Sequence, residues 1–106
     1  MSDAMKTARN LVADSRRVLA VTGAGLSTAS GIPDFRGPQG RWTQDPEAEK
    51  ISTLSYYLHD EGVRRKAWQA RLTSPARTAH PNPGHRALVD VERSGRLAGI
   101  VTQNTD

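Results

Sequence analysis

An apolar run that ends in a glycine-rich turn constrains this chain most. Residues 18–22 read Val-Leu-Ala-Val-Thr, which is typical of a buried strand, and Gly23-Ala24-Gly25 follow directly. Glycine can adopt positive φ and lets a ligand approach the backbone, and the amides at the start of a following helix face an anion. The generic dinucleotide motif has Gly or Ala where this chain has Thr28. The pattern therefore predicts a site for a nucleotide or another anion in an α/β fold.

A second apolar run, residues 97–102, ends in polar residues suited to ligand recognition. Gln103, Asn104 and Asp106 follow it. Two strands joined by helical segments are parallel, and ligands of open parallel sheets bind beyond the carboxyl ends of the strands. We therefore expect the residues after both strands to lie at the same edge of the sheet. Amides and a carboxylate there can each orient one donor or acceptor of a ligand.

The remaining sequence predicts helices around these two strands. We expect a helix over 3–15, a short helix over 27–32, a loop over 32–51, helices over 52–59 and 60–73, and irregular structure over 74–83. Asn82 and Pro83 favour a helix start, and Gly95 favours its end. Apolar residues on both faces of 18–22 predict a strand covered on both sides. The expected fold class is α/β, an incomplete Rossmann-like parallel sheet of two strands and four to five helices.

Composition excludes several other classes of protein. The 106 residues suffice for one domain and include no cysteine, so we expect neither a disulfide nor a thiolate metal site. The net charge of +4 arises from charges of both signs, and we expect no nucleic-acid partner and no membrane segment. A basic nucleic-acid-binding module using the face from Arg64 to Arg71 stays open as an alternative. Asp3 and Asp14 argue against a mitochondrial presequence, and we expect a cytoplasmic protein.

Two longer motifs sharpen the prediction. Gly23 to Ser27 runs into Ser30-Gly31-Ile32-Pro33-Asp34-Phe35-Arg36-Gly37, and the chain ends on Thr102-Gln103-Asn104-Thr105-Asp106. These segments resemble the two signatures of the sirtuins, the NAD-dependent protein-lysine deacylases. The resemblance runs from about Val18 to the last residue and covers the first part of that family's catalytic domain. A weaker likeness, in residues 63–68 together with Pro81-Asn82-Pro83-Gly84-His85, is to the class II, lipoamidase-like branch.

The resemblance implies a cofactor, a substrate and a set of site residues. The cofactor is NAD, and the partner is an acylated lysine of a protein substrate. Gly23, Ala24 and Gly25 would hold the pyrophosphate, with Ser27 close to the phosphates. The ribose and nicotinamide end of NAD would be bound by the remaining residues of the two signatures, which are Ile32, Asp34, Phe35, Arg36, Gln103, Asn104 and Asp106. For Asp34, Phe35 and Arg36 the alternative is an ordinary loop with a surface ion pair between Asp34 and Arg36. We expect Trp42 to seat this loop rather than to contact the ligand.

The resemblance also implies what residues 1–106 do not supply. The family's catalytic base follows the second signature, so we expect no catalytic residue here, and His59, His80 and His85 to be structural or surface residues. We expect residues 1–106 to be the N-terminal part of a single NAD-binding catalytic domain, without the zinc module and the C-terminal half. We expect no metal site in the chain, and zinc only in the complete protein. A short NAD-binding protein without catalysis is the remaining alternative.

Overall fold

The computed structural model describes all residues from Met1 to Asp106, and they form two compact units. The first unit combines Met1–Gly23 with Pro81–Asn104, and the second combines Ala24–His80 with Thr105–Asp106. Segments distant in sequence therefore meet within each unit. None of the helices has both the length and the apolar composition needed to cross a membrane.

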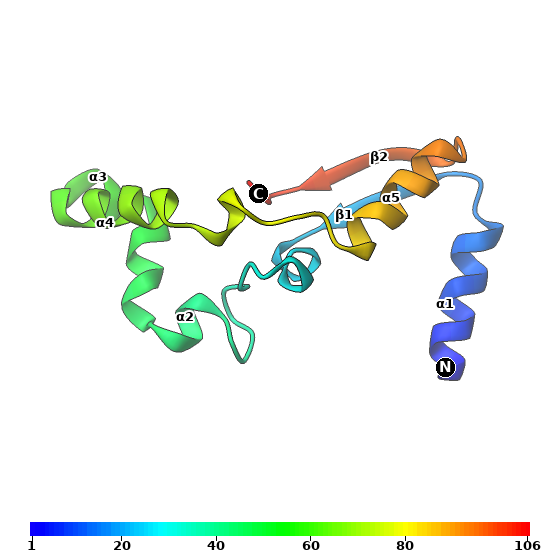
Figure 1. The fold of residues 1–106 in the computed structure, drawn as a ribbon, viewed down its shortest axis with the longest axis horizontal. Helices are drawn as coiled ribbons and strands as arrows, with labels where there is room; N and C mark the ends of the chain where they lie inside the picture. Colours follow the sequence, from blue (N-terminus) through cyan, green and yellow to red (C-terminus); the bar gives the residue numbers. More distant parts are fainter. The chain divides into compact units, whose positions relative to one another are not determined.

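The first unit is built on two parallel strands. Strand β1 (Val18–Thr22) pairs with β2 (Leu97–Thr102), and Thr22 lies opposite Thr102 at the carboxyl end of both strands. The register shifts between Val18 and Leu19. Figure 1 shows the two strands side by side, with helix α5 (Pro83–Arg93) beside them. The predicted strand bounds and the parallel pairing are both confirmed.

Helix α5 begins and ends where the sequence predicts. The buried Asn82 side chain accepts hydrogen bonds from the amides of Gly84 and His85, and the amide of Asn82 donates to Nδ1 of His85. This reciprocal arrangement satisfies backbone donors that a helix start leaves unpaired. At the other end Gly95 adopts a φ of 76°, a left-handed conformation that favours glycine.

Helix α1 (Asp3–Asp14) is linked to the rest of the first unit by an arginine. The guanidinium of Arg96 donates hydrogen bonds to the carbonyls of Val12, Ala13 and Ser15, at 2.8, 3.3 and 3.3 Å. A cation at the carboxyl end of a helix also interacts favourably with the helix dipole. The prediction of a structural helix over 3–15 is confirmed.

The apolar core is small. Ala20 and Ala67 are the only buried hydrophobic residues, whereas Leu19 and Val21 of β1 are 60% and 75% exposed. The prediction that β1 is covered on both faces is therefore wrong for these residues. Alternation along β1 turns Ala20 inward and sends its two neighbours to the opposite face, which is uncovered.

The second unit begins with turns rather than with the predicted short α-helix over 27–32. Two 3₁₀ turns, Ala24–Leu26 and Thr28–Ser30, take its place and end at Gly31, where φ is 85°. The predicted loop over 32–51 also contains structure, helix α2 (Arg41–Gln44) and the 3₁₀ helix η3 (Pro46–Ser52). Asp45 caps η3 and Pro46 supplies its first position, a start signal within a segment rich in Pro and Gly.

Two helices that contact each other complete the second unit. Helices α3 (Leu54–His59) and α4 (Glu61–Leu72) lie side by side in Figure 1 and contact each other and η3. Asp60 caps α4 by accepting a hydrogen bond from the amide of Val63. A short 3₁₀ turn, Pro75–Arg77, interrupts the segment predicted to be irregular. The predicted helices over 52–59 and 60–73 are confirmed.

Candidate functional site

The carboxyl ends of β1 and β2 bring parts of both sequence motifs together in the first unit. Gly23 follows β1 and Gln103 follows β2, directly after the paired residues Thr22 and Thr102. The side-chain amide of Asn104 donates a hydrogen bond of 2.9 Å to the carbonyl of Gly23. The expectation that the two motifs share one edge of the sheet is confirmed for these residues.

Glycine at positions 23 and 25 leaves the backbone accessible from outside and is not required by the backbone conformation. Neither residue has a positive φ, so the turn itself does not require glycine there. A Cβ built on Gly23 or Gly25 would have no heavy atom within 4 Å. The surface above this backbone is therefore open, and a ligand could approach it closely. This observation fits the phosphates of a dinucleotide.

The expected helix dipole is not available at this site. The turns Ala24–Leu26 and Thr28–Ser30 have three residues each, too short to build up a helix dipole. The hydroxyl of Thr28 donates to the carbonyl of Gly25 at 2.9 Å. This contact was not foreseen, and it gives Thr28 a role in shaping the turn. Any anion held here would be bound by individual amides and side chains.

A serine–aspartate contact joins the two motifs within the second unit. The hydroxyl of Ser27 donates a hydrogen bond of 2.6 Å to the carboxylate of Asp106. Ser27 is only 2% exposed, and its carbonyl accepts a bond from the amide of Ile32 at 3.4 Å. Asp106 itself is exposed. A hydrogen bond to a charged carboxylate is short and directional, so Ser27 orients Asp106.

The segment Asp34-Phe35-Arg36 is held in place by Arg41 and Trp42. The rings of Phe35 and Trp42 lie 5.0 Å apart between centroids, and the guanidinium of Arg36 lies 4.5 Å from the centre of the Trp42 ring. The amides of Arg41 and Trp42 donate to the carbonyls of Asp34 and Phe35, at 2.8 and 2.9 Å. The expectation that Trp42 seats this loop is confirmed.

The alternative reading of this loop, an ion pair between Asp34 and Arg36, is not what the structure shows. The Asp34 carboxylate accepts a hydrogen bond from the amide of Gly37 at 3.0 Å, and the three ion pairs of the chain lie elsewhere. Asp34 also helps to line a cavity of about 370 Å³ together with Ile32 and Gly31. A polar and an apolar residue of the predicted site therefore face the same open volume.

The histidines have the structural roles expected of them where the structure gives them contacts. His85 completes the cap of α5, and Nδ1 of His59 lies 2.8 Å from the carbonyl of Ser55. His80 is exposed. No group of three or more His, Cys, Asp or Glu residues is placed to hold a metal ion.

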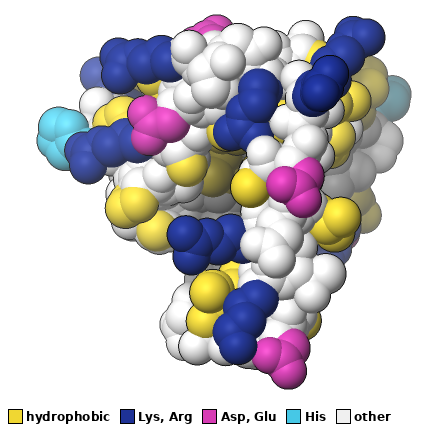
Figure 2. Space-filling view, turned by 90° about the vertical axis from the view of Figure 1, so that its right-hand side faces the viewer, with side chains coloured by type: hydrophobic (Ala, Val, Ile, Leu, Met, Phe, Trp, Pro, Cys, Tyr) yellow, Lys and Arg dark blue, Asp and Glu magenta, His cyan; other side chains and the backbone are white.

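Two of the basic residues on α4 are engaged within the chain. Arg65 pairs with Glu61 on α4, and the guanidinium of Arg64 donates to the carbonyls of Tyr57 and Leu58. Figure 2 shows Lys and Arg side chains interspersed with acidic, hydrophobic and uncharged ones on the face that it presents. A continuous basic surface of the kind that tracks a nucleic-acid backbone is not seen on this face.

Comparison with known proteins places these motifs in context. The model of the Sir2 family matches residues 23–106. A Streptomyces coelicolor protein described as NAD-dependent protein deacetylase 2 is 52% identical over 89 residues, which cover 84% of this chain and 37% of the relative.

Solved structures show the same likeness in three dimensions. A Sir2 homologue in complex with NAD matches with a TM-score of 0.70 and 36% identity, over 95% of this chain and 39% of that one. A Sir2 variant with a deacetylated p53 peptide and an acetylated ADP-ribose matches with a TM-score of 0.77 and 33% identity, over 94% and 39%. The chain thus spans well under half the length of the proteins it matches.

Proposed function

Because the chain belongs to the Sir2 family, we propose that it forms the NAD-binding, N-terminal part of an NAD-dependent protein deacetylase. The observation that carries this proposal is the hydrogen bond from Asn104 to Gly23. It joins the second motif to the first at the carboxyl ends of two parallel strands, where α/β proteins bind nucleotides. Two of the similar proteins, one described as an NAD-dependent protein deacetylase and one a Sir2 homologue in complex with NAD, support the same assignment.

Each predicted residue then has a part in holding NAD. The open backbone at Gly23, Ala24 and Gly25 admits the pyrophosphate, and Gln103 binds a ribose hydroxyl. NAD supplies an electrophilic ribose carbon and nicotinamide as its leaving group.

The nicotinamide end of the cofactor is handled by the other residues of the two motifs. Asn104 and Asp106 bind the carboxamide, with the carboxylate held in place by Ser27. Phe35, seated on Trp42, keeps water away from the reacting ribose, and Arg36 orients the loop. Ile32 and Asp34 line the open volume beside this loop.

The substrate in this proposal is an acylated lysine side chain of another protein. The peptide complex of the Sir2 variant described above supports a protein substrate. We extend the proposal to acyl groups larger than acetyl, on the resemblance to the lipoamidase-like branch. A panel of peptides that differ only in an acetyl-, succinyl- or lipoyl-lysine tests this, and turnover of the acetyl peptide alone would restrict the activity to deacetylation.

Catalysis in this proposal needs residues other than these 106. A general base contributes typically ~10²–10⁴-fold to a rate, and positioning of the reactants can contribute ~7–11 kcal/mol. We propose that the base lies elsewhere in a complete enzyme, because in the family it follows the second motif. We propose the same of any zinc site, because these residues include no cysteine. Residues 1–106 alone should then release no nicotinamide that depends on an acetylated peptide.

The proposal also extends to the place where the protein acts. Arg96 holds helix α1 within the first unit, which supports a structural role for the N-terminal segment. We therefore propose a cytoplasmic protein. Immunodetection in membrane, periplasmic and cytoplasmic fractions of the cells that make it tests this, and recovery outside the cytoplasm would contradict it.

A chimera tests the proposed function directly. Residues 1–106 replace the matching segment of the Streptomyces coelicolor relative, and deacetylation of an acetyl-lysine peptide is measured with and without NAD. We expect NAD-dependent turnover, and we expect Asn104→Ala to lower kcat/KM at least tenfold. Asn10→Ala, in the exposed face of α1, is the matched control and should leave turnover unchanged. A folded chimera without NAD-dependent turnover would overturn the proposal.

A further inference from the structure

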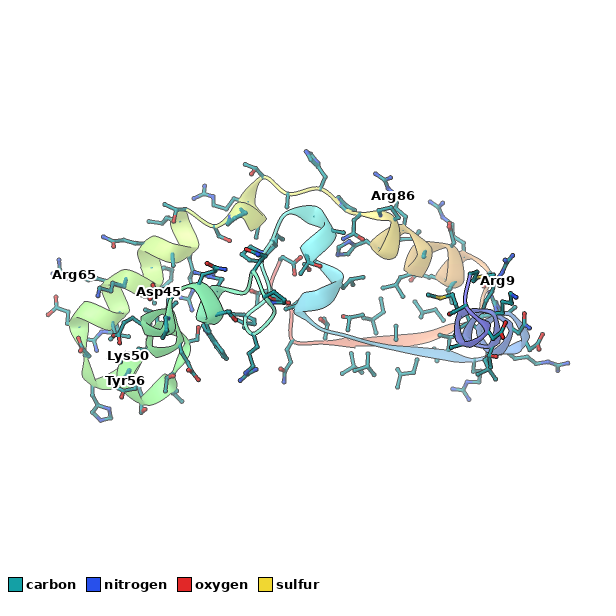
Figure 3. The ribbon with its side chains drawn as sticks, turned by 90° about the horizontal axis from the view of Figure 1, so that it is seen from below. Arg9, Asp45, Lys50, Tyr56, Arg65 and Arg86 are labelled. Atoms are coloured by element: carbon teal, nitrogen blue, oxygen red, sulfur yellow. The ribbon has the colours of Figure 1, made fainter.

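A second cavity lies in the second unit, and none of the residues predicted to bind NAD lines it. It has a volume of about 510 Å³ and is lined by residues of α2, η3 and α4. Figure 3 shows two of these residues, Asp45 and Lys50, among the helices of this part of the chain. A volume of this size lies within the range of small-molecule sites. Nothing in the proposed function uses this cavity.

Part of the cavity wall is apolar. Ala48 and Ile51 come from η3, one turn apart, and Val63 and Ala70 come from the same face of α4. These side chains are small or branched, so they present a shallow aliphatic surface rather than an aromatic one. A short aliphatic group would replace water there.

Two of the six charged lining residues neutralise each other. The ammonium of Lys50 lies 2.7 Å from the carboxylate of Glu47. The hydrogen bond and the charge of Lys50 lower the pKa of Glu47, and the same contact raises the pKa of Lys50. Both groups therefore stay ionised near neutral pH, and together they add no net charge to the wall.

Two further lining residues are carboxylates with one oxygen already engaged. Oδ1 of Asp45 accepts the amide of Glu47 at 3.1 Å, and Oδ1 of Asp60 accepts the amide of Val63 at 3.2 Å. The other oxygen of each carboxylate makes no hydrogen bond within the protein. Each can accept one from a cationic donor on a ligand.

The last two charged residues of the wall are cations, and the charge of one of them, Lys66, also helps to lower the pKa of Glu47. The side chains of Arg41 and Lys66 line the cavity and make no hydrogen bond or ion pair. Arginine and lysine bind carboxylates by charge-assisted hydrogen bonds. The wall thus offers two available cations and two available carboxylate oxygens beside an aliphatic surface.

We propose that this cavity binds a small aliphatic zwitterion of the free α-amino acid class. The ligand's carboxylate contacts Arg41 and Lys66, its ammonium contacts Asp45 and Asp60, and its side chain lies on the apolar wall. A simple anion of the same size would leave both aspartates unpaired and be repelled by them, and a simple amine would leave both cations unpaired. The balance of three basic and three acidic lining residues favours a ligand with both charges.

Three probes with the same aliphatic part test the proposal. Leucine has both charges, isocaproate lacks the ammonium, and isoamylamine lacks the carboxylate. Binding is measured by ligand-observed NMR and calorimetry on the complete chain and on the chimera described above. We expect saturable binding of leucine and at least tenfold weaker binding of the other two. Isocaproate or isoamylamine binding as tightly as leucine would overturn the proposal, as would the absence of leucine binding to the folded chimera.

Two variants, one of a lysine and one of an arginine, distinguish a specific contact with the ligand from a general effect of the protein's charge. Lys66→Gln removes a proposed ligand contact and should lower the affinity for leucine about tenfold, since hydrogen bonds to charged groups are strong. Arg65→Gln removes the same charge from the neighbouring residue, which does not line the cavity and pairs with Glu61 one turn earlier on α4. Arg65→Gln should leave leucine binding unchanged, and an equal loss in both variants would contradict the assignment. None of these readouts depends on NAD, so the outcome is separate from that of the proposed function.

Discussion

The hydroxyl of Ser27 donates a hydrogen bond of 2.6 Å to the carboxylate of Asp106, although the two residues are 79 positions apart. Ser27 is buried and Asp106 is exposed, so this contact is shielded from water on the serine side only. The buried partner sets the direction of the carboxylate, and the exposed side can receive a ligand. Because Ser27 already orients the carboxylate of Asp106, less conformational entropy is lost when a ligand binds to it.

Asp106→Asn should impair nicotinamide handling more than NAD affinity. The amide can still accept from Ser27, but the charge that strengthens both this bond and the contact to the carboxamide is gone. In the chimera we expect nicotinamide to inhibit about tenfold less well, with a smaller change in the Kd for NAD. Asp90→Asn, an exposed position on α5, is the matched control. Unchanged turnover and unchanged nicotinamide inhibition in Asp106→Asn would show that this residue lies outside the site.

Gly40→Ala should destabilise the loop that carries Phe35. The φ of Gly40 is −67°, which any residue adopts, but a Cβ there would lie 2.5 Å from the carbonyl oxygen of Phe35. Relief of such overpacking costs about 1–3 kcal/mol. We expect a lower thermal unfolding midpoint of the chimera. In Gly99→Ala, where the nearest atom to the new Cβ is 3.7 Å away, the midpoint should change little, and equal midpoints in the two variants would refute the packing argument.

Lys50→Gln should raise the pKa of Glu47 toward its ordinary value. The hydrogen bond and charge of Lys50 are what lower this pKa. A lowered carboxylate pKa means that the contact stabilises the fold above the ordinary pKa and stops doing so as the pH falls through the lowered one. Because both side chains are well exposed, the effect on stability is small and falls with added salt. Carboxyl-carbon NMR against pH measures the shift, and an unchanged titration in Lys50→Gln would contradict this cause.

Residues 1–106 alone should unfold without a sharp transition. Ala20 and Ala67 are the only buried hydrophobic residues, and the edges and one face of the β1–β2 pair are open. Ordering costs ~1.5 kcal/mol per residue, which so small a core barely offsets. Circular dichroism during a thermal scan should show a broad change and a tendency of the exposed strand edges to self-associate. A cooperative melt from a soluble monomer would show an autonomous domain and favour the short NAD-binding protein.

Local signals in the sequence predicted most of the elements. The two strands are contiguous apolar runs, and α4 and α5 begin at Asp60 and Asn82, whose side chains cap them. The meeting of Gly23 and Asn104 at one sheet edge followed from the topology of parallel strands. These features depend on interactions within a few residues or on chain connectivity, which a single sequence records.

The features that were missed depend on longer-range or finer geometry. Glycines and prolines over 32–51 masked α2 and η3, whose starts at Gly40 and Asp45 resemble turn residues. The helix expected over 27–32 is replaced by 3₁₀ turns, the second of which ends at Gly31 in a left-handed conformation. The bond between Ser27 and Asp106 joins residues far apart in the sequence, and neither residue shows its partner in any local pattern.

The central claim is that the open backbone at Gly23 to Gly25 binds the pyrophosphate of NAD, and Gly25→Ala tests it most directly. The φ of Gly25 is not positive and a Cβ there meets no atom within 4 Å, so the variant chimera should unfold at the same temperature as the unaltered one. Gly95→Ala is the converse control. Because the φ of Gly95 is 76°, we expect this variant to lose about 1 kcal/mol of stability but to keep its affinity for NAD. In calorimetric titrations with NAD, we expect Gly25→Ala to bind at least tenfold more weakly. Unaltered NAD affinity in a folded Gly25→Ala chimera would contradict the account.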